Sequence, residues 1–288
     1  MTHSAHNIQA HGILADVDAG VPESILTYMQ SEDFDYLYRL EESFWWFLGM
    51  RDITRVLLDQ VEFHADDGAP RKSRVLDAGC GTGGMLEWLA GFAPDAEVSG
   101  IDIAPDALHY ARSRGHLRLA QASATELPFA DEAFDIVTSF DVLVQLPGGD
   151  AAERAMNEMH RVLRPGGVCF VRVAAYSWMR SGHDRALGTV RRFNLNELQT
   201  TMQASGFEIL RTTYANACLL PVAALHRLVL KPLNIVNAGS DVKPLAPRLQ
   251  WLNRLMTGVL RSEARRLEHP HARLPFGLSA ICIGRRPL

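Results

Sequence analysis

The chain has 288 residues, of which 47% are hydrophobic and 22% charged, and its formal net charge is −4. This length predicts one large domain or one domain with an appendage, and the charge argues against a nucleic-acid-binding protein that works through bulk positive charge. The N-terminal residues lack a signal-peptide pattern and no run is apolar enough to span a bilayer, so we expect a cytoplasmic protein. The four cysteines form no CxxC pair, which argues against a disulfide framework or a zinc site.

Helical patterns dominate the first part of the sequence. We expect residues 1–20 to form a frayed tail. The helical pattern that follows includes a segment dense in aromatic residues at 36–51. A polar stretch at 65–73 is the natural boundary. We therefore expect residues 1–70 to form a tail and a helical segment, and residues 71–288 to form the main domain.

From residue 74 onwards, strand-like and helix-like segments alternate, which predicts a parallel sheet with helices on both faces. The expected strands are 74–78, 97–103, 117–121, 134–140, 168–174, 207–214 and 277–285. The expected helices are 83–92, 105–114, 150–164 and 194–205, and a helical insertion at about 217–272 separates the last two strands. Asp150 with Glu153 and Asn194 with Glu197 have the spacing of capping boxes.

The stretch Val75–Met85 runs from a buried strand through a glycine turn into a helix. A helix N-terminus offers unpaired N–H groups, so we expect an anionic or carboxylate-bearing cofactor beside it. The spacing Gly79-x-Gly81-x-x-Gly84 matches the dinucleotide fingerprint. The alternative is S-adenosylmethionine (SAM), because a carboxylate before the glycines, here Asp77, suits an ammonium group better than a pyrophosphate.

Two downstream motifs decide between these cofactors. They are Leu127-Pro128-Phe129, followed by Phe134-Asp135, and Arg164-Pro165-Gly166-Gly167. Together with Val75–Gly83 and Gly100-Ile101-Asp102, they resemble the class I SAM-dependent methyltransferases, most closely the small-molecule branch, over about residues 73–175. The resemblance implies an α/β, Rossmann-like seven-stranded sheet whose C-terminal strand is antiparallel between strands five and six. SAM would lie over the carboxyl ends of strands one, two and four.

The same resemblance implies roles for individual residues. Asp77 would orient the ammonium group of SAM, and Asp102 would accept hydrogen bonds from both ribose hydroxyls. The other implied contacts are Gly79, Cys80 and Gly81 to the methionine part, Ile103 to adenine, and Phe140 to the methionine moiety and the reaction centre. Where the family commonly has Asp before Ala, this chain has Ser123 before Ala124, so the adenine contact would rest on a serine hydroxyl or on the Ala124 backbone.

The N-terminal flank, Phe44–Arg51, is similar to an aromatic lid in a bacterial subgroup of these enzymes. A lid of this kind would stack on SAM, here through Trp45, and Arg51 would pair with the SAM carboxylate. The alternative is that the aromatic residues only pack the N-terminal helices onto the sheet.

The segment after the fifth strand supplies the candidate catalytic residues, because the same subgroup has a His-Asp pair there. His183 would remove a proton from the acceptor and Asp184 would orient it. Alternatively, these residues form a structural ion-pair loop with Arg191 and Arg192, or the two arginines hold an anionic substrate group. We expect no metal site, since the spacing His269-Pro270-His271 has no third ligand nearby.

These features predict a SAM-dependent methyltransferase acting on a small, apolar or lipid- or sugar-linked acceptor, with S-adenosylhomocysteine as product. The alternatives are a binding protein that keeps the fold without catalysis and an NAD-dependent oxidoreductase. We expect a monomer or homodimer. Residues 219–236 form either a buried helix or a peripheral membrane contact.

Overall fold

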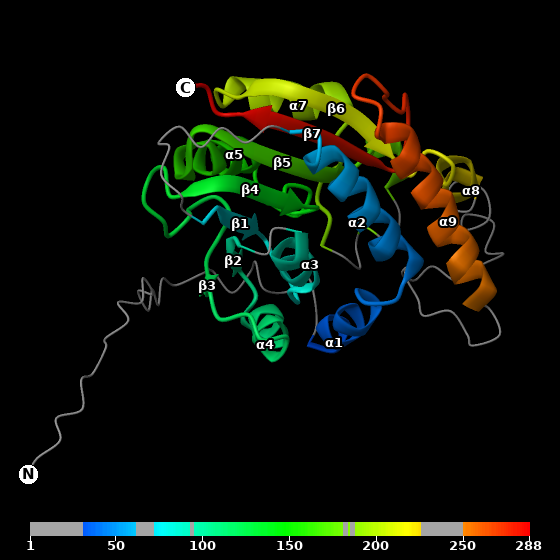
Figure 1. Cartoon of the computed structure of the whole chain (residues 1–288), viewed down its shortest axis with the longest axis horizontal. Helices are drawn as coiled ribbons and strands as arrows, with labels where there is room; N and C mark the ends of the chain where they lie inside the picture. The colour runs from blue at the N-terminus through cyan, green and yellow to red at the C-terminus, as the bar shows by residue number, and fades with distance from the viewer. Residues whose placement is uncertain (1–30, 62–71, 93–94, 181–183, 185–187, 226–249) are drawn as a thin grey trace, which may run out of the picture.

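The computed structural model describes residues 31–61, 72–92, 95–180, 184, 188–225 and 250–288 (Figure 1). A seven-stranded sheet runs through it in the order β3-β2-β1-β4-β5-β7-β6, and β7 is antiparallel to both of its neighbours. The strands are β1 Arg74–Ala78, β2 Glu97–Asp102, β3 Leu119–Gln121, β4 Phe134–Phe140, β5 Leu163–Ala174, β6 Glu208–Ala215 and β7 Ser279–Arg285. The predicted fold class and the antiparallel insertion of the last strand are confirmed.

Helices cover both faces of this sheet. They are α1 Ser31–Leu40, α2 Trp45–Leu58, α3 Gly84–Phe92, α4 Pro105–Ser113, α5 Ala151–Val162, α7 Leu195–Ala204, α8 Leu220–Leu225 and α9 Gln250–Leu267, with a short 3-10 turn at Ser177–Met179. Figure 1 shows α2, α3 and α9 on one face of the sheet, and α5 and α7 on the other. The described helices include none that is both long enough and apolar enough to cross a membrane.

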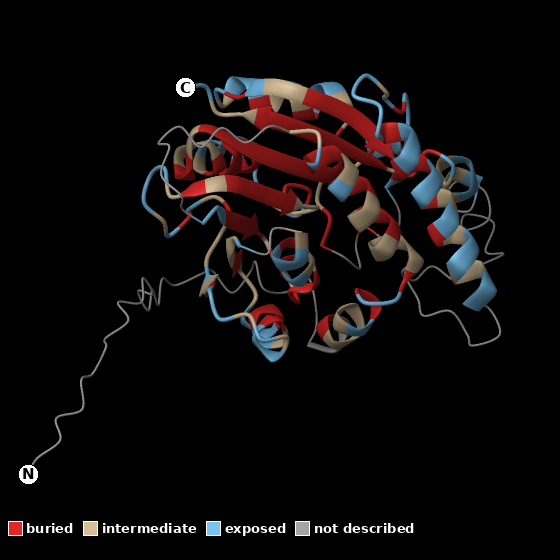
Figure 2. Cartoon of the chain, in the orientation of Figure 1, coloured by how far each residue is buried: buried red, intermediate tan, exposed pale blue. Residues whose placement is uncertain are grey.

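The core lies on both sides of the central strands. Val168 to Val173 of β5 are all buried, as expected for a strand covered on both faces (Figure 2). The N-terminal helix α2 belongs to the same core, because Ile53 and Leu57 have no exposed surface and pack in the main cluster with the strands. It lies close to α9 at Gly49, where a Cβ would overlap Leu260.

Some predicted element boundaries are wrong. The strand β3 begins at Leu119, since Leu117 is 83% exposed and pairing with β2 starts at Gly100–Leu119. The helix before β5 ends at Val162, and β5 begins at Leu163. The strand includes Pro165-Gly166-Gly167, which lie where the pairing with β4 shifts register between Leu163 and Val168. The motif expected to stop a helix is therefore part of a strand.

The two predicted capping boxes have different outcomes. Asn194 Oδ1 accepts from Glu197 N at 2.9 Å and Glu197 Oε2 accepts from Asn194 N at 2.7 Å, so this box is confirmed. Asp150 makes no side-chain cap, because its backbone (φ −103°, ψ −2°) is not the extended conformation that aims a cap side chain at the first turn. Within the predicted helical insertion at about 217–272, residues 226–249 lie outside the described residues, and α8 and α9 lie on either side of them.

Candidate active site

Asp77 lies near the end of β1, with 1% of its surface exposed, and its Oδ1 accepts a hydrogen bond from Thr138 Oγ1 at 2.8 Å. The two residues are paired in register across β1 and β4. Burial raises the pKa of Asp77 to about 7, against the opposing effects of the Thr138 hydrogen bond and the positive charge of Arg172. A buried carboxyl group of this kind is stabilised in its charged form by a cationic ligand.

The glycine turn after β1 is tied to the end of β2. The amides of Gly79 and Cys80 both donate to Ile101 O at 2.8 Å. Gly79 has φ +93°, and a Cβ there would overlap Val142, so this position requires glycine. Gly81 N donates to Asp102 Oδ2 at 2.8 Å, and Ala104 N donates to Asp102 Oδ1 at 2.9 Å. Each Asp102 oxygen therefore accepts from at least one backbone amide, and the Ile103 amide also bonds this carboxylate.

The N-terminus of α3, which follows the turn, carries a feature that was not predicted. Glu41, directly after α1, is buried, and its Oε2 accepts from Thr82 Oγ1 at 2.6 Å and from Gly84 N at 3.1 Å. A carboxylate of the chain itself therefore bonds the Gly84 amide at this helix terminus, while the predicted cofactor anion beside it stays a prediction. Nothing in the local sequence signals this contact, because Glu41 and Gly84 are 43 positions apart.

Arg51 of α2 also contacts the turn. Its Nη2 donates to Gly84 O at 2.9 Å, while its buried Nε has no hydrogen-bond partner among the described residues. Trp45, one of the predicted lid residues, begins α2, and its backbone N donates to Asn253 Oδ1 of α9 at 2.8 Å. The next residue, Trp46, places its ring 4.9 Å from the guanidinium carbon of Arg172.

The remaining predicted adenine contacts lie around the ends of β2 and β3. Ile103 is partly buried directly after β2, and its carbonyl accepts from Gln121 Nε2 at 3.1 Å. The Ser123 hydroxyl lies 2.8 Å from the Thr125 hydroxyl and accepts from Thr125 N at 3.2 Å. Ala124 is buried at 4% exposure. The serine that replaces the usual aspartate is therefore engaged in a local turn.

A buried arginine that we did not predict lies beside this site. Arg172 of β5 is 5% exposed and pairs with Asp141, which follows β4, at 2.8 Å. Its guanidinium carbon lies 4.9 Å from the ring of Trp46 and 4.9 Å from that of Phe140. The sequence did carry a signal, since an arginine within a buried apolar strand requires a charged partner.

Three residues with left-handed backbone follow the carboxyl ends of β4, β5 and β6. Asp141 (φ 60°) follows β4, Tyr176 (φ 61°) follows β5, and Asn216 (φ 61°) follows β6. Such conformations cost free energy in residues other than glycine and concentrate at functional sites. Asn216 is fully buried, and its Oδ1 has no hydrogen-bond partner in the described part of the chain.

The predicted catalytic pair is only partly visible, because His183 lies outside the described residues. Asp184 is buried and pairs with Arg192 at 2.6 Å, and Arg192 Nη1 donates to Ala175 O at 2.7 Å. Asp184 therefore holds the loop to the end of β5, as in the structural alternative. The role of His183 as a base stays a prediction.

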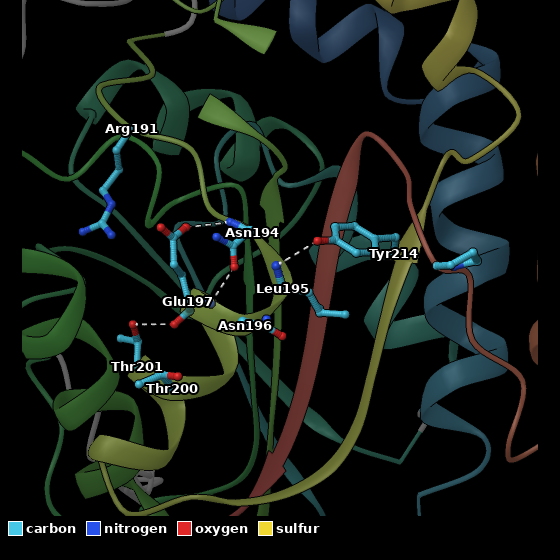
Figure 3. A pocket seen from close by; sticks show the side chains of 9 residues that line it. Arg191, Asn194, Leu195, Asn196, Glu197, Thr200, Thr201 and Tyr214 are labelled. Carbon is cyan, nitrogen blue, oxygen red and sulfur yellow. Dashed lines mark hydrogen bonds between the residues drawn. The ribbon is translucent and has the colours of Figure 1, made fainter. Parts of the chain in front are cut away.

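A separate hollow of about 720 Å³ lies at the start of α7. Figure 3 shows its lining, which includes Arg191, Asn194, Glu197 and Tyr214. Its main polar groups are already bonded: Asn194 and Glu197 form the capping box, and Leu195 N donates to Tyr214 Oη at 3.1 Å. It is distinct from the glycine turn, and nothing in its chemistry indicates the cofactor.

Among the described side chains, no group of three or more His, Cys, Asp or Glu has the arrangement of a metal site.

Comparisons with known proteins agree with this geometry. Residues 76–171 match the family model described as "Methyltransferase domain". A Mycolicibacterium smegmatis protein named "Probable S-adenosylmethionine-dependent methyltransferase" is 33% identical over 192 residues, which cover 64% of this chain and 69% of that protein. The chain belongs to the class I SAM-dependent methyltransferases. This membership selects SAM over a dinucleotide as the cofactor.

Other relatives of this methyltransferase match over shorter stretches. The demethylmenaquinone methyltransferase of Thermus thermophilus is 40% identical over 99 residues, 33% of this chain and 44% of that protein. The fatty-acid O-methyltransferase of Mycolicibacterium smegmatis is 37% identical over 97 residues, 33% of this chain and 34% of that protein. The chain thus spans less than half the length of these two curated relatives.

Solved structures support the fold. Phosphoethanolamine N-methyltransferase 2 of Haemonchus contortus, solved with phosphomonomethylethanolamine and S-adenosylhomocysteine, has a TM-score of 0.58 at 15% identity, over 92% of this chain and 60% of that one. A SAM-dependent methyltransferase from Thermotoga maritima has a TM-score of 0.52 at 16% identity, over 89% and 97%. At these identities the likeness concerns the fold alone.

Proposed function

We propose that this methyltransferase transfers the methyl group of SAM to a small, largely apolar acceptor that carries a hydroxyl or amine at the reacting atom. The observation that carries the proposal is the buried carboxyl group of Asp77, which lies directly before the glycine turn. Burial raises its pKa to about 7. A carboxyl group in that position gains most from a ligand with an ammonium group, which the methionine part of SAM provides.

The residues present fit SAM along its length. Asp77 would hold the ammonium group, and Arg51, whose Nε has no partner among the described residues, would hold the carboxylate. Asp102 would accept from the ribose hydroxyls, and Ile103 would pack on adenine. When bound, SAM supplies a methyl group already activated by a sulfonium. The chain then has only to align the acceptor, exclude water and take up a proton.

The acceptor side combines apolar walls with hydrogen-bond acceptors. Trp46 and Phe140 flank Arg172, and Met50 lies one helical turn after Trp46. Asp141 gives one oxygen, Oδ2, to Arg172 and retains Oδ1, and Asn216 Oδ1 has no partner among the described residues. A buried oxygen without a partner, as in Asn216, calls for a donor on the ligand. The Asp141 side chain is 27% exposed, so a ligand can reach it. We infer that Asp141 accepts the proton or hydrogen bond of the reacting hydroxyl or amine, with Arg172 fixing its orientation.

The relatives give the proposal its substrate class. Their names point to a demethylated menaquinone and a fatty acid, which are apolar molecules with one polar group. A lipid-like acceptor also agrees with the exposed apolar side chains of α8 and α9, namely Val222, Leu225, Trp251 and Leu255. Arg254, Arg265 and Arg266 are exposed on the same helix α9, a charge that suits an anionic lipid surface.

The test has two stages. Calorimetry with S-adenosylhomocysteine establishes whether the chain binds the cofactor product, and absence of binding would contradict the proposal. Transfer of labelled methyl from SAM to a panel of isoprenoid quinols, fatty acids and aromatic amines then identifies the acceptor. Asp141→Asn should lower turnover of the best acceptor by about a hundredfold, as expected for loss of a general base, while cofactor binding stays close to wild type.

A further inference from the structure

The N-terminal helix α1 is bound to the glycine turn through one carboxylate. Glu41 is 7% exposed, and its Oε2 takes both the hydroxyl of Thr82 and the amide of Gly84. The Gly84 amide is one of the N–H groups at the start of α3 that have no partner within the helix. Glu41 therefore caps α3 from a different part of the chain, and its charge lies at the positive end of the helix dipole.

Arg114, the residue after α4, joins the same contact. Its Nη2 lies 3.2 Å from Glu41 Oε2 and donates to Tyr38 O at 2.7 Å, and its Nε donates to Thr82 O at 3.0 Å. Its guanidinium carbon lies 4.1 Å from the centre of the Tyr38 ring, and only 3% of its side chain is exposed. One buried arginine thus binds both the N-terminal segment and the turn.

Gly84 is the point where the N-terminal helices and the turn meet. Its N–H donates to Glu41, and its carbonyl accepts from Arg51 of α2. A Cβ at Gly84 would overlap the Glu41 carboxylate, so the close approach depends on glycine. Arg51 is the residue proposed to hold the SAM carboxylate. The hydrogen bond from Glu41 that fixes Gly84 therefore also fixes the carbonyl to which Arg51 donates.

We propose that Glu41 is a positioning residue for the cofactor, which couples docking of α1 and α2 to the conformation of the turn 79–84. The inference rests on the proposed SAM site and extends it. If the docked turn is the form that binds SAM, a change that lowers the docked population weakens SAM binding in proportion, by at most the docking free energy that is lost. The contact is not a ligand site, because the chain itself supplies the carboxylate.

The sharpest test compares Glu41→Gln with Glu42→Gln. Both glutamates pair with Arg114, but the Glu42 side chain is 62% exposed and reaches only Arg114 Nη1, at 2.8 Å. We expect Glu41→Gln to raise the Kd for S-adenosylhomocysteine by about tenfold or more, which matches the loss of one charge-assisted hydrogen bond. Glu42→Gln should stay within about twofold, as exposed ion pairs contribute little.

A second pair of variants, both at Thr82, keeps the test decisive if Glu41→Gln does not fold. Thr82 is fully buried, and Thr82→Val keeps its shape while removing the hydroxyl that donates to Glu41. Thr82→Ser retains the hydroxyl and should restore affinity, which a role in packing alone would not do. Circular dichroism and thermal melts identify the temperature at which each variant is folded, and Kd is measured below it.

Two results separate this inference from the proposed function. If the wild-type chain does not bind S-adenosylhomocysteine, the proposed function is wrong. If the wild-type chain binds it, and folded Thr82→Val binds it with the same Kd, the positioning role of Glu41 is wrong while the SAM site stands.

Discussion

Arg172 and Asp141 are joined twice, because the Arg172 guanidinium pairs with the Asp141 carboxylate at 2.8 Å and Asp141 N donates to Arg172 O at 2.8 Å. The backbone bond holds Asp141 in its left-handed conformation directly after β4. The ion pair orients the carboxylate and neutralises it within a largely apolar surrounding. This relationship places Arg172 of β5 and Asp141, directly after β4, together at the carboxyl ends of the strands where the cofactor motifs meet.

Replacement of Arg172 by methionine should affect both stability and the titration of Asp77. Breaking a largely buried ion pair should lower the free energy of unfolding by about 1–3 kcal/mol, less than for a fully buried pair because Asp141 retains some exposure. The charge of Arg172 lowers the pKa of Asp77, so that pKa should rise above its present value of about 7. Urea unfolding measures the first effect, and the pH dependence of S-adenosylhomocysteine binding measures the second.

Arg118→Met is the matched control for this variant, since Arg118 is 58% exposed and pairs with Glu97 at 3.0 Å. It should leave both measurements close to wild type. An Arg172→Met protein with unchanged pH dependence of binding would show that Arg172 and Asp77 are not coupled.

Cofactor affinity should increase with pH below neutrality. Burial raises the pKa of Asp77 to about 7, so the free protein is mostly protonated there at about pH 6 and must lose that proton to face an ammonium group. S-adenosylhomocysteine should therefore bind about fivefold more weakly near pH 6 than near pH 7, with proton release on binding. Calorimetry in buffers of different ionisation enthalpy measures both quantities.

The stability of the ligand-free protein should change with pH in the opposite direction to the binding affinity. A carboxyl group whose pKa is raised in the folded state contributes stability that is present below its ordinary value and lost as pH rises towards about 7. Asp77→Asn should remove both pH dependences and bind the ligand weakly at every pH. Retention of the pH-dependent binding by Asp77→Asn would assign it to another group.

Asp102→Ala should abolish cofactor binding. The carboxylate holds the Gly81 and Ala104 amides and is proposed to accept both ribose hydroxyls, so its removal disrupts the turn and the ligand together. We expect a loss of affinity of at least about a hundredfold, measured by calorimetry. Glu97→Gln, at the start of the same strand, should bind normally, and a normal Kd for Asp102→Ala would contradict the ribose assignment.

The two adjacent tryptophans of α2 should differ in their effect on turnover. Trp46 lies over Arg172, whereas the Trp45 ring packs 5.2 Å from the ring of Phe44. Trp46→Ala removes one side of the Arg172 stack and should raise the KM of the acceptor more than Trp45→Ala does. Steady-state kinetics with the identified acceptor tests this, and the reverse order would support Trp45 as the lid residue that faces the reaction.

Much of the fold was predictable because strands and helices alternate with clear turn residues between them. The adjacency of Asp77 and Asp102 was also predictable, since the carboxyl ends of parallel strands meet at one edge of a sheet. Glu41 was not, because a cap supplied from 43 residues away leaves no local pattern. Asp150 shows the converse case, in which a capping sequence is present but the backbone conformation prevents the bond.

The position of β7 has a consequence for synthesis of the chain on the ribosome. Among the described strands, β6 is hydrogen-bonded to β7 alone, although β6 precedes β7 by more than sixty residues. The first five strands can pair while translation continues, but β6 must wait for β7. During this interval the backbone N–H and C=O groups along the edges of β6 have no partner strand, so this segment is where a nascent chain would most need a chaperone.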